Sequence, residues 1–448
     1  MDPALLAAYD RPVPRYTSYP TAAQFTPSVG AAQHEAWLRA LNEISASLYV
    51  HVPFCKELCW YCACHTMAMN RPGTLDSYAD ALLRELETLA GVVPGLILEG
   101  VQWGGGTPSQ LGAARLEAVG KRIAALFDRR CDAEVSLEID PRRCDREIAA
   151  AAAAIGVTRV SLGVQDFDEG VQAAINRRQS FTDTADAIDR LRAVGIGRFN
   201  IDLVYGLPHQ TLETLAATLD LALKLGPDRF AVFGYAHVPW MKPHQKLIEN
   251  ADLPDNALRA AMSTLVAERL VTAGYCRIGL DHYARPGDRL ARAAAAGTLH
   301  RNFQGYVADR AAFVAGIGAS AISSLPRGFT QNAADPSRYM AAVATGGFAT
   351  ARGVALTRDD RLRGAIIERV MCHNAVDLAA LCSEYQVSHK AFRASLDPHL
   401  DRLERDGLIR RADAQVTVTE TGRPFVRFVC AAFDRHYAGG AGRHSRGL

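Results

Sequence analysis

Three cysteines in the first part of the chain have the type and spacing that a metal cluster requires. Cys55, Cys59 and Cys62 form the pattern CxxxCxxC. Three thiolates at this spacing can wrap one face of an iron–sulfur cube, which leaves the fourth iron open to a small chelating molecule. A structural zinc site is the alternative, because Cys64 or His65 could supply a fourth ligand. The chain has no second cysteine pair at zinc-knuckle spacing, so the sequence favours the cluster.

The CxxxCxxC pattern is typical of the radical S-adenosylmethionine (SAM) superfamily, in which the open iron binds the amino and carboxylate groups of SAM. A glycine-rich turn, GGGTP at 104–108, follows the next predicted strand. Glycine lets the backbone approach a ligand closely and adopt positive φ. An ordinary tight turn is the alternative, but the position of this turn after the cysteine loop favours contact with the amino group of SAM.

Polar residues also stand at the ends of later predicted strands. Glu138 ends the third strand, Gln165 ends the fourth, Asp202 lies in the fifth, and Arg177 follows in an INRRQ segment. A buried carboxylate is costly unless it is paired. Carboxylates could bind the ribose hydroxyls and the amino group of SAM, and Arg177 its carboxylate. Each residue alone fits a structural ion pair equally well, but their joint placement favours a binding site.

The elements that would position these residues alternate between strands and helices from about residue 46 to 283. This βαβα pattern predicts an α/β fold whose parallel sheet has helices outside it and closes as a complete or partial (β/α) barrel. Functional residues should then lie where strands end. The predicted strands are Leu48–Val52, Val101–Gly104, Val135–Ile139, Val160–Val164, Asn200–Val204, Phe230–Tyr235 and Cys276–Leu280.

Beyond about residue 355 the pattern changes to helices. Arg358–Met371, Val376–Glu384 and His389–Asp406 are predicted helices, and a short hairpin follows at Leu408–Val418, as in a winged-helix module. A DNA-binding regulator is one alternative function. However, the third helix mixes basic and acidic side chains, which is typical of a solvated face rather than a phosphate-binding stripe. The proline-rich segment 1–35 is predicted to be an arm that packs on the rest.

The composition fits a globular protein of more than one domain. The chain has 448 residues, 49% hydrophobic and 22% charged, with a net charge of +2. This balance gives no reason to expect nucleic acid or a membrane as a partner. There is no apolar run long enough to span a bilayer and no secretory signal, so we expect a cytoplasmic protein. In a reducing compartment, a tight cysteine cluster indicates metal or redox chemistry rather than disulfides.

Several long motifs together resemble the oxygen-independent coproporphyrinogen III oxidases (coproporphyrinogen dehydrogenases). The resemblance begins at PRYTSYPTA (Pro14–Ala22) and covers nearly the whole chain. It continues through LYVHVPFCKELCWYCAC, QWGGGTP, SLEIDPR, SLGVQDF, NIDLVYGLP, YAHVPW, DHYARP, HRNFQGY and GASAIS. It implies a radical SAM partial (β/α) barrel at 36–296, preceded by the arm at 1–35. A mostly helical, winged-helix-like C-terminal domain at 297–448 would follow.

The resemblance also implies a set of cofactor-binding residues. The family's cluster ligands match Cys55, Cys59 and Cys62, which with Glu138 form the expected catalytic set. The positions that match SAM-binding residues of the family are Tyr49, Tyr61, Gly105, Gly106, Thr107, Glu138, Gln165, Arg177, Asp202, Ala236 and Ile322. Phe303 and Gln304 match residues at a second SAM position near the substrate cavity. The expected cofactors are therefore one [4Fe–4S] cluster and two SAM molecules.

The activity that the resemblance implies is the anaerobic oxidative decarboxylation of two propionates of coproporphyrinogen III to vinyl groups. The product would be protoporphyrinogen IX, in heme and porphyrin biosynthesis. The cluster would give one electron to SAM, and the resulting 5′-deoxyadenosyl radical would take a β-hydrogen from a propionate. A flavodoxin- or ferredoxin-type electron donor and a monomeric protein are expected.

A heme chaperone, or a paralog that acts on another tetrapyrrole, is the alternative within the same superfamily. Such paralogs typically carry an aromatic residue where this chain has Cys64, so Cys64 and the HRNFQGY motif favour the oxidase. Two positions depart from the family pattern. The segment Val307–Arg310 reads VADR where two threonines and an acidic residue are usual, and His65 replaces an asparagine. Both changes lie toward the expected substrate side.

Overall fold

The chain, described by a computed structural model over residues 2–437, is built around one mixed sheet of twelve strands. Its order across the sheet is β16 (Thr350–Ala355), β15 (Gly328–Asn332), β14 (Ile322–Leu325), β13 (Phe313–Ile317), β1 (Ser45–Val52), β4 (Ile97–Gly105), β5 (Asp128–Ile139), β6 (Arg159–Gln165), β7 (Phe199–Tyr205), β8 (Arg229–Gly234), β10 (His282–Ala284) and β9 (Cys276–Ile278). Neighbouring strands from β13 to β8 are parallel. The edge strands β16 and β9 are not paired with each other within the described residues, so the barrel is partial, as predicted.

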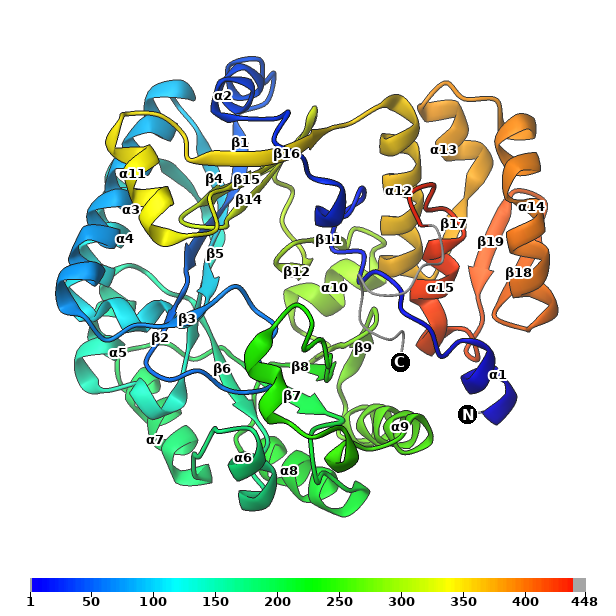
Figure 1. The fold of residues 1–448 in the computed structure, drawn as a ribbon, viewed down its shortest axis with the longest axis horizontal. Coiled ribbons are helices and arrows are strands. Elements are labelled where there is room, and N and C mark those ends of the chain that lie inside the picture. Colours follow the sequence, from blue (N-terminus) through cyan, green and yellow to red (C-terminus); the bar gives the residue numbers. More distant parts are fainter. Residues whose placement is uncertain (1, 438–448) are drawn as a thin grey trace.

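Helices cover the outer face of the parallel strands (Figure 1). Those between β1 and β8 in the chain connect one parallel strand to the next, as expected, and the other helices precede β1 or follow β8. Their bounds are α2 (Ala31–Arg39), α3 (Pro72–Val92), α4 (Ala113–Leu126), α5 (Arg146–Ala154), α6 (Glu169–Ala174), α7 (Phe181–Ala193), α8 (Leu212–Lys224), α9 (Asn256–Thr272), α10 (Arg289–Ala295) and α11 (Pro336–Ala344). Local signals set their starts: Ser180 and Asp183 form a capping box at α7, which then buries Ile188 and Leu191 against the sheet.

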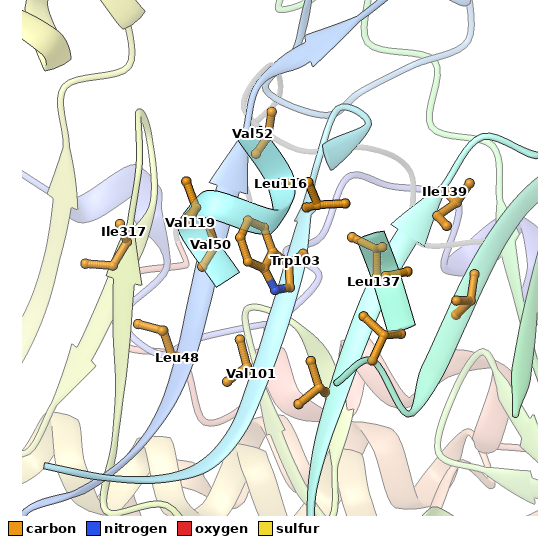
Figure 2. Close-up of a cluster of buried hydrophobic side chains, with 14 of the residues drawn as sticks. Leu48, Val50, Val52, Val101, Trp103, Leu116, Val119, Leu137, Ile139 and Ile317 are labelled. Carbon is orange, nitrogen blue, oxygen red and sulfur yellow. The ribbon is translucent and has the colours of Figure 1, made fainter. Parts of the chain in front are cut away.

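The main hydrophobic core lies between these helices and the sheet. Leu48, Val50 and Val52 on β1 lie beside Trp103 on β4, and Val119 of α4 packs over them (Figure 2). These side chains are almost fully buried. Removing such a residue leaves a cavity and typically costs about 2–5 kcal/mol. The central strands are therefore a rigid base for whatever lies on their other face.

Alternation along each strand fixes what the other face carries. Successive side chains in a strand point to opposite faces. Because Leu48 and Val50 face the helices, Tyr49 between them faces inward, and it pairs in register with Gln102 of β4. By the same alternation, Glu138 of β5 stands opposite Ser161 of β6. The parallel register thus brings polar residues from distant parts of the chain to one inner surface.

Both edges of the sheet are antiparallel, which the sequence did not predict. The last predicted strand, Cys276–Leu280, is β9, and it pairs antiparallel with β10, which in turn is antiparallel to β8. At the other edge, β14, β15 and β16 follow β13 as antiparallel hairpins. These four strands follow residue 296, where the sequence placed the end of the barrel, and they extend the same sheet.

The C-terminal part is mostly helical, as predicted. Three helices pack with a small sheet (Figure 1). The helices are α12 (Arg358–His373), α13 (Leu378–Glu384) and α14 (His389–Arg405), and the strands are β17 (Ala375–Asp377), β18 (Ile409–Ala412) and β19 (Gln415–Val418), followed by α15 (Val426–Ala431). Arg411 on β18 forms ion pairs with Asp397, Asp401 and Glu404 of α14. Three acidic side chains of α14 are therefore paired within this C-terminal part.

The first part of the N-terminal arm, up to Tyr19, packs on this helical part, whereas Phe25 stacks on Phe329 and Thr26 pairs with Gly353 at the edge of the main sheet. After the short helix α1 (Pro3–Ala8), Tyr9, Val13, Tyr16 and Tyr19 are buried in the C-terminal hydrophobic core. The Tyr9 hydroxyl donates to Asp406 at 2.6 Å, and the Tyr16 hydroxyl donates to Asp434 at 3.1 Å. In Figure 1 the blue arm runs alongside the red and orange helices. Within residues 2–437, no helix is long and apolar enough to cross a membrane.

Candidate active site

One cavity of about 630 Å³ opens on the inner face of the sheet, at the carboxyl ends of the parallel strands. Its wall is completed by the N-terminal arm and by residues beside α15. Of the predicted site residues, those that line it are Tyr49, Cys55, Cys59, Tyr61, Cys62, Gly105, Gly106, Thr107, Glu138, Gln165, Arg177, Asp202, Ala236, Phe303 and Gln304. Ile322, on β14, is not among the lining residues, so its role in SAM binding stays a prediction.

The cysteine loop is anchored at both ends. Cys55 ends β2 (Phe54–Cys55), which pairs with β3 (Met67–Ala68). The Cys55 thiol lies 3.1 Å from the Thr66 hydroxyl and 3.6 Å from that of Thr107, and Arg177 Nη1 donates to Cys59 Sγ at 3.6 Å. All ten cysteines are free thiols. The three predicted ligands therefore face one space, with hydroxyl groups beside the Cys55 sulfur and a guanidinium beside the Cys59 sulfur.

The donor set fits a cluster. No three His, Cys, Asp or Glu side chains among the described residues converge closely enough to enclose a single metal ion. An iron–sulfur cube is larger than one ion, and its thiolate ligands stand apart around it. Three soft sulfur ligands on one loop match this requirement. Cys64, predicted not to be a ligand, also lines the cavity, and its hydrogen bond with Cys62 raises the pKa of the Cys62 thiol.

Packing within the protein requires glycine at two positions of the GGGTP turn, in addition to any contact with a ligand. Gly105 has φ of +115°, and a Cβ there would lie 2.7 Å from the His51 ring. A Cβ on Gly106 would lie 2.5 Å from Thr66 Oγ1 and 2.7 Å from the Phe54 carbonyl oxygen. The turn thus packs directly against the cysteine loop. This contact sets the distance between the predicted cluster and the predicted SAM-binding backbone.

Two buried carboxyl groups face the same space. Burial raises the pKa of Glu138 to about 8, and the nearby Asp202 and Cys64 add to the rise. The Gly105 N–H donates to Glu138 Oε2 at 3.2 Å. Burial likewise raises the pKa of Asp202, which accepts hydrogen bonds from Ser161 and Asn200. A donor or a cation that binds beside such a carboxyl group favours its ionised form, which is the stronger acceptor.

Arg177 supplies the positive charge next to the cysteine loop. It forms an ion pair with Asp140 at 3.4 Å and donates to the Gly163 carbonyl oxygen. These neighbours keep its pKa above the usual value, so it is always charged. Its Nε is buried without a hydrogen-bond partner among the described residues. Gln165 beside it has φ of +72°, and such strained backbone is common where a ligand is bound.

Comparison with known proteins agrees with this geometry. The radical SAM superfamily model matches residues 49–222, and the HemN C-terminal domain model matches residues 356–425. The oxygen-independent coproporphyrinogen III oxidase of Bradyrhizobium diazoefficiens is 44% identical over 441 residues, covering 97% of each chain. The chain belongs to this family. The Escherichia coli relative of the same name is 38% identical and covers 97% of this chain and 95% of its own.

A solved structure of a family member has the same fold. The coproporphyrinogen III oxidase of Escherichia coli, described as a radical SAM enzyme, matches with a TM-score of 0.92 and 36% identity. The match covers 97% of this chain and 99% of that one. Radical SAM enzymes use a [4Fe–4S] cluster and SAM, and the cysteine loop, the glycine turn and Arg177 of this family member fit both.

Sequence reasoning missed several residues of the cavity. His51 lies on β1 two positions after Tyr49, so strand alternation alone could have placed it on the same face. Burial lowers its pKa to about 4, so it is neutral, and its ring lies 3.0 Å from the Tyr49 hydroxyl. The cavity is also lined by arginines that were not predicted: Arg15, Arg259, Arg277, Arg301 and Arg427.

These arginines come from five separate elements, and no local pattern connects them. Arg15 belongs to the arm, Arg259 to α9, Arg277 to β9 and Arg427 to α15. Arg301 lies in β11 (His300–Asn302), which pairs with β12 (Gly305–Val307) in a small hairpin. The Nε and Nη1 atoms of Arg301 are buried without a hydrogen-bond partner among the described residues. Family membership and this basic wall together point to an anionic substrate.

The two departures from the family pattern lie in different places. His65 lines the main cavity and forms a 2.8 Å hydrogen bond with the Ala334 carbonyl oxygen. Val307–Arg310 is outside the lining of the main cavity, and Asp309 in this segment accepts a hydrogen bond from Ser47 at 2.8 Å. Val307, Ala308 and Asp309 line a second cavity of about 210 Å³, whose lining also includes Glu138, Asp202 and Gln304, so the second departure adjoins predicted SAM-binding residues.

Proposed function

We propose that this chain converts two propionate side chains of coproporphyrinogen III to vinyl groups without oxygen, giving protoporphyrinogen IX. The proposal rests on one cavity. This cavity is lined by the cysteine loop, by the glycine turn and the carboxyl groups that are expected to bind SAM, and by five further arginines. Coproporphyrinogen III is a tetrapyrrole with four propionates. Arginine matches a carboxylate in geometry and charge, so this wall suits the substrate.

The roles of the individual residues follow from their positions. Cys55, Cys59 and Cys62 would hold the cluster. The glycine turn, Glu138 and Asp202 would bind the amino and ribose groups of SAM, and Arg177 its carboxylate. The family resemblance assigns the remaining SAM contacts to Tyr49, Tyr61, Gln165 and Ala236, which line the cavity, and to Ile322, which does not. Phe303 and Gln304, which lie next to Arg301, would form a second SAM position near the substrate.

The cofactors supply the radical chemistry: when bound, the cluster provides one electron and SAM provides the radical that takes a β-hydrogen from the propionate. The chain itself holds the reactants in place and excludes water. Arg277 and Arg301 are positioned to bind propionates, which would keep one β-carbon near the SAM site. That same propionate would lose its carboxylate as CO₂ and one electron would pass to an acceptor, which leaves the vinyl group. The buried walls formed by the arm and α15 limit solvent access.

The proposed function also includes an electron donor and a cellular location. The electron donor is expected to be a flavodoxin- or ferredoxin-type protein, and the chain is expected to act as a monomer. Ten free thiols, three of them proposed as cluster ligands, support a reducing compartment such as the cytoplasm. The domain limits 1–35, 36–296 and 297–448 remain a prediction, and the strands beyond residue 296 favour a later limit for the barrel.

The test is an anaerobic incubation of the reconstituted protein with SAM, a reductant and coproporphyrinogen III. Both 5′-deoxyadenosine and protoporphyrinogen IX should form. Deoxyadenosine without a vinyl product, in protein with a full cluster, would indicate a paralog with another substrate. Stoichiometric heme binding with neither product would indicate a heme chaperone.

A further inference from the structure

A short segment that covers the cysteine loop carries an unusual surface. Among the described residues, five large hydrophobic side chains are exposed, and three of these belong to one segment, 236–248. They are Trp240, Met241 and Leu247, with exposed fractions of 55%, 57% and 57%. A group of exposed apolar side chains, with a tryptophan among them, is typical of a protein-binding site.

The segment is ordered, so the exposure is not that of a loose loop. Gln245 is fully buried at its centre, accepts a hydrogen bond from the Val238 N–H at 2.6 Å and donates to the Ala236 carbonyl oxygen at 3.2 Å. The Met241 N–H closes a turn on Val238 at 2.8 Å. These internal bonds hold the segment in one conformation while Trp240 stays in solvent. A preformed surface loses little conformational entropy when a partner binds.

The same segment is bonded directly to the cluster loop. Gln245 Nε2 donates to the Tyr61 carbonyl oxygen at 2.8 Å, His244 Nε2 lies 2.7 Å from that of Cys62, and Lys242 Nζ donates to that of Cys64 at 2.7 Å. Cys62 is a proposed cluster ligand. The exposed patch is therefore separated from this ligand by a single hydrogen-bonded layer. Electron transfer slows steeply with distance, so a donor seated here would reach the cluster by a short path.

The charge of the patch indicates the kind of donor. Segment 236–248 has two lysines and two histidines and no acidic residue. Lys242 and Lys246, two of the chain's six lysines, flank Trp240, Met241 and Leu247 along this segment. A basic rim around an apolar centre attracts an acidic partner and speeds its approach.

We propose that the surface formed by Trp240, Met241, Lys246 and Leu247 is the docking site for a small acidic one-electron carrier protein. The carrier gives up one electron there, and the oxidised cluster takes it up. The inference rests on the proposed function, because only a cluster that must be reduced needs such a donor. It adds the place of contact and the chemistry of the partner.

The test compares a protein donor with a small reductant. Holoprotein and SAM are incubated anaerobically with flavodoxin hydroquinone, which is oxidised to the semiquinone as it gives one electron, or with dithionite, which needs no docking. Trp240→Ala and Lys246→Glu should each raise the KM for flavodoxin about tenfold in 5′-deoxyadenosine formation. The rate with dithionite should not change, because neither side chain lines the cavity.

Matched controls lie on other faces of the protein. Val271→Ala removes an exposed apolar side chain of α9, 52% exposed, and Lys390→Glu reverses an exposed lysine of α14. Neither should change the KM for flavodoxin. Added salt should weaken the wild-type interaction more than that of Lys246→Glu. An unchanged KM for flavodoxin in both patch variants would overturn the proposal, as would equal losses with both reductants.

Direct binding separates this inference from the proposed function. Isothermal titration of oxidised flavodoxin into the holoprotein needs no turnover, and Trp240→Ala should weaken the measured affinity. If the wild type makes no vinyl product but binds flavodoxin through this surface, the proposed function fails and the docking site stands. If Trp240→Ala changes the oligomeric state measured by ultracentrifugation and not the flavodoxin affinity, the patch is a contact between copies of the chain.

Discussion

The ionisation of Glu138 should control the binding of SAM. Its carboxyl group has a pKa of about 8 in the free protein because burial disfavours the charge. If SAM binds the ionised form, the carboxyl must lose its proton first, so SAM affinity falls as the pH drops below 8. The ionised fraction predicts a loss of roughly eightfold between pH 8.5 and pH 7.0. Hydrogen bonds to a charged group contribute about 1.5–3 kcal/mol, which makes the effect measurable.

The variant Glu138→Gln isolates this effect, because the amide keeps the shape and cannot ionise. The amino group of SAM also titrates in this range, but it does so equally for both proteins. The ratio of the two SAM affinities, measured by anaerobic equilibrium dialysis at several pH values, should therefore rise from near one at pH 6.5 to at least tenfold at pH 9. A ratio that stays constant with pH would refute the assignment, because it would mean that Glu138 contacts SAM without a change of charge.

Four further predictions concern the cofactor loop and the scaffold. Serine at any of the three cluster cysteines should abolish the brown cluster absorbance, whereas Cys64→Ser should keep it; the reverse pattern would contradict the ligand assignment. Asp202→Asn should weaken SAM binding about tenfold in the same dialysis assay, and an unchanged affinity would make this carboxylate structural. Gly106→Ala should displace the turn and lower SAM affinity at least tenfold, because its Cβ would meet the Phe54 carbonyl, whereas Gly73→Ala, with nothing within 4 Å, is the control and should leave affinity unchanged. Tyr16→Phe should lower the free energy of unfolding by about 1 kcal/mol in denaturant titration, because the Asp434 carboxylate loses a donor.

The parallel half of the fold could be predicted because its signals are local. Strands β1 and β4 to β8 have buried apolar residues, and their order follows from one βαβ unit after another. The cysteine loop and the GGGTP turn are compact motifs whose spacing is visible without a structure. The fold class, the partial barrel and the helical C-terminal part were therefore predicted correctly. The residues that the sequence placed in the site come together in one cavity, apart from Ile322.

The rest depended on contacts between distant residues. Strands β9 and β14 are only three and four residues long, and their antiparallel pairing is decided by neighbours that periodicity does not reveal. The arginines of the cavity come from segments spread between residues 15 and 427, so no motif marks them. The inward position of His51 was available from strand alternation, but its neutral state follows only from its burial. The spacing of residues in a sequence reveals a local motif. Residues that many elements bring together in one cavity wall are found only in the folded structure.

The position of the N-terminal arm has a consequence for the timing of assembly. Arg15 and Thr17 line the same cavity as Pro424 and Arg427, and Arg427 donates to the Val13 carbonyl oxygen across 414 positions of sequence. A ribosome makes the arm and the cysteine loop early and α15 late. Until α15 is complete, the arm lacks its contacts with Phe428 and Arg427, and the cavity lacks one wall. The cavity can therefore close only after α15 has been made, long after the cysteine loop has left the ribosome.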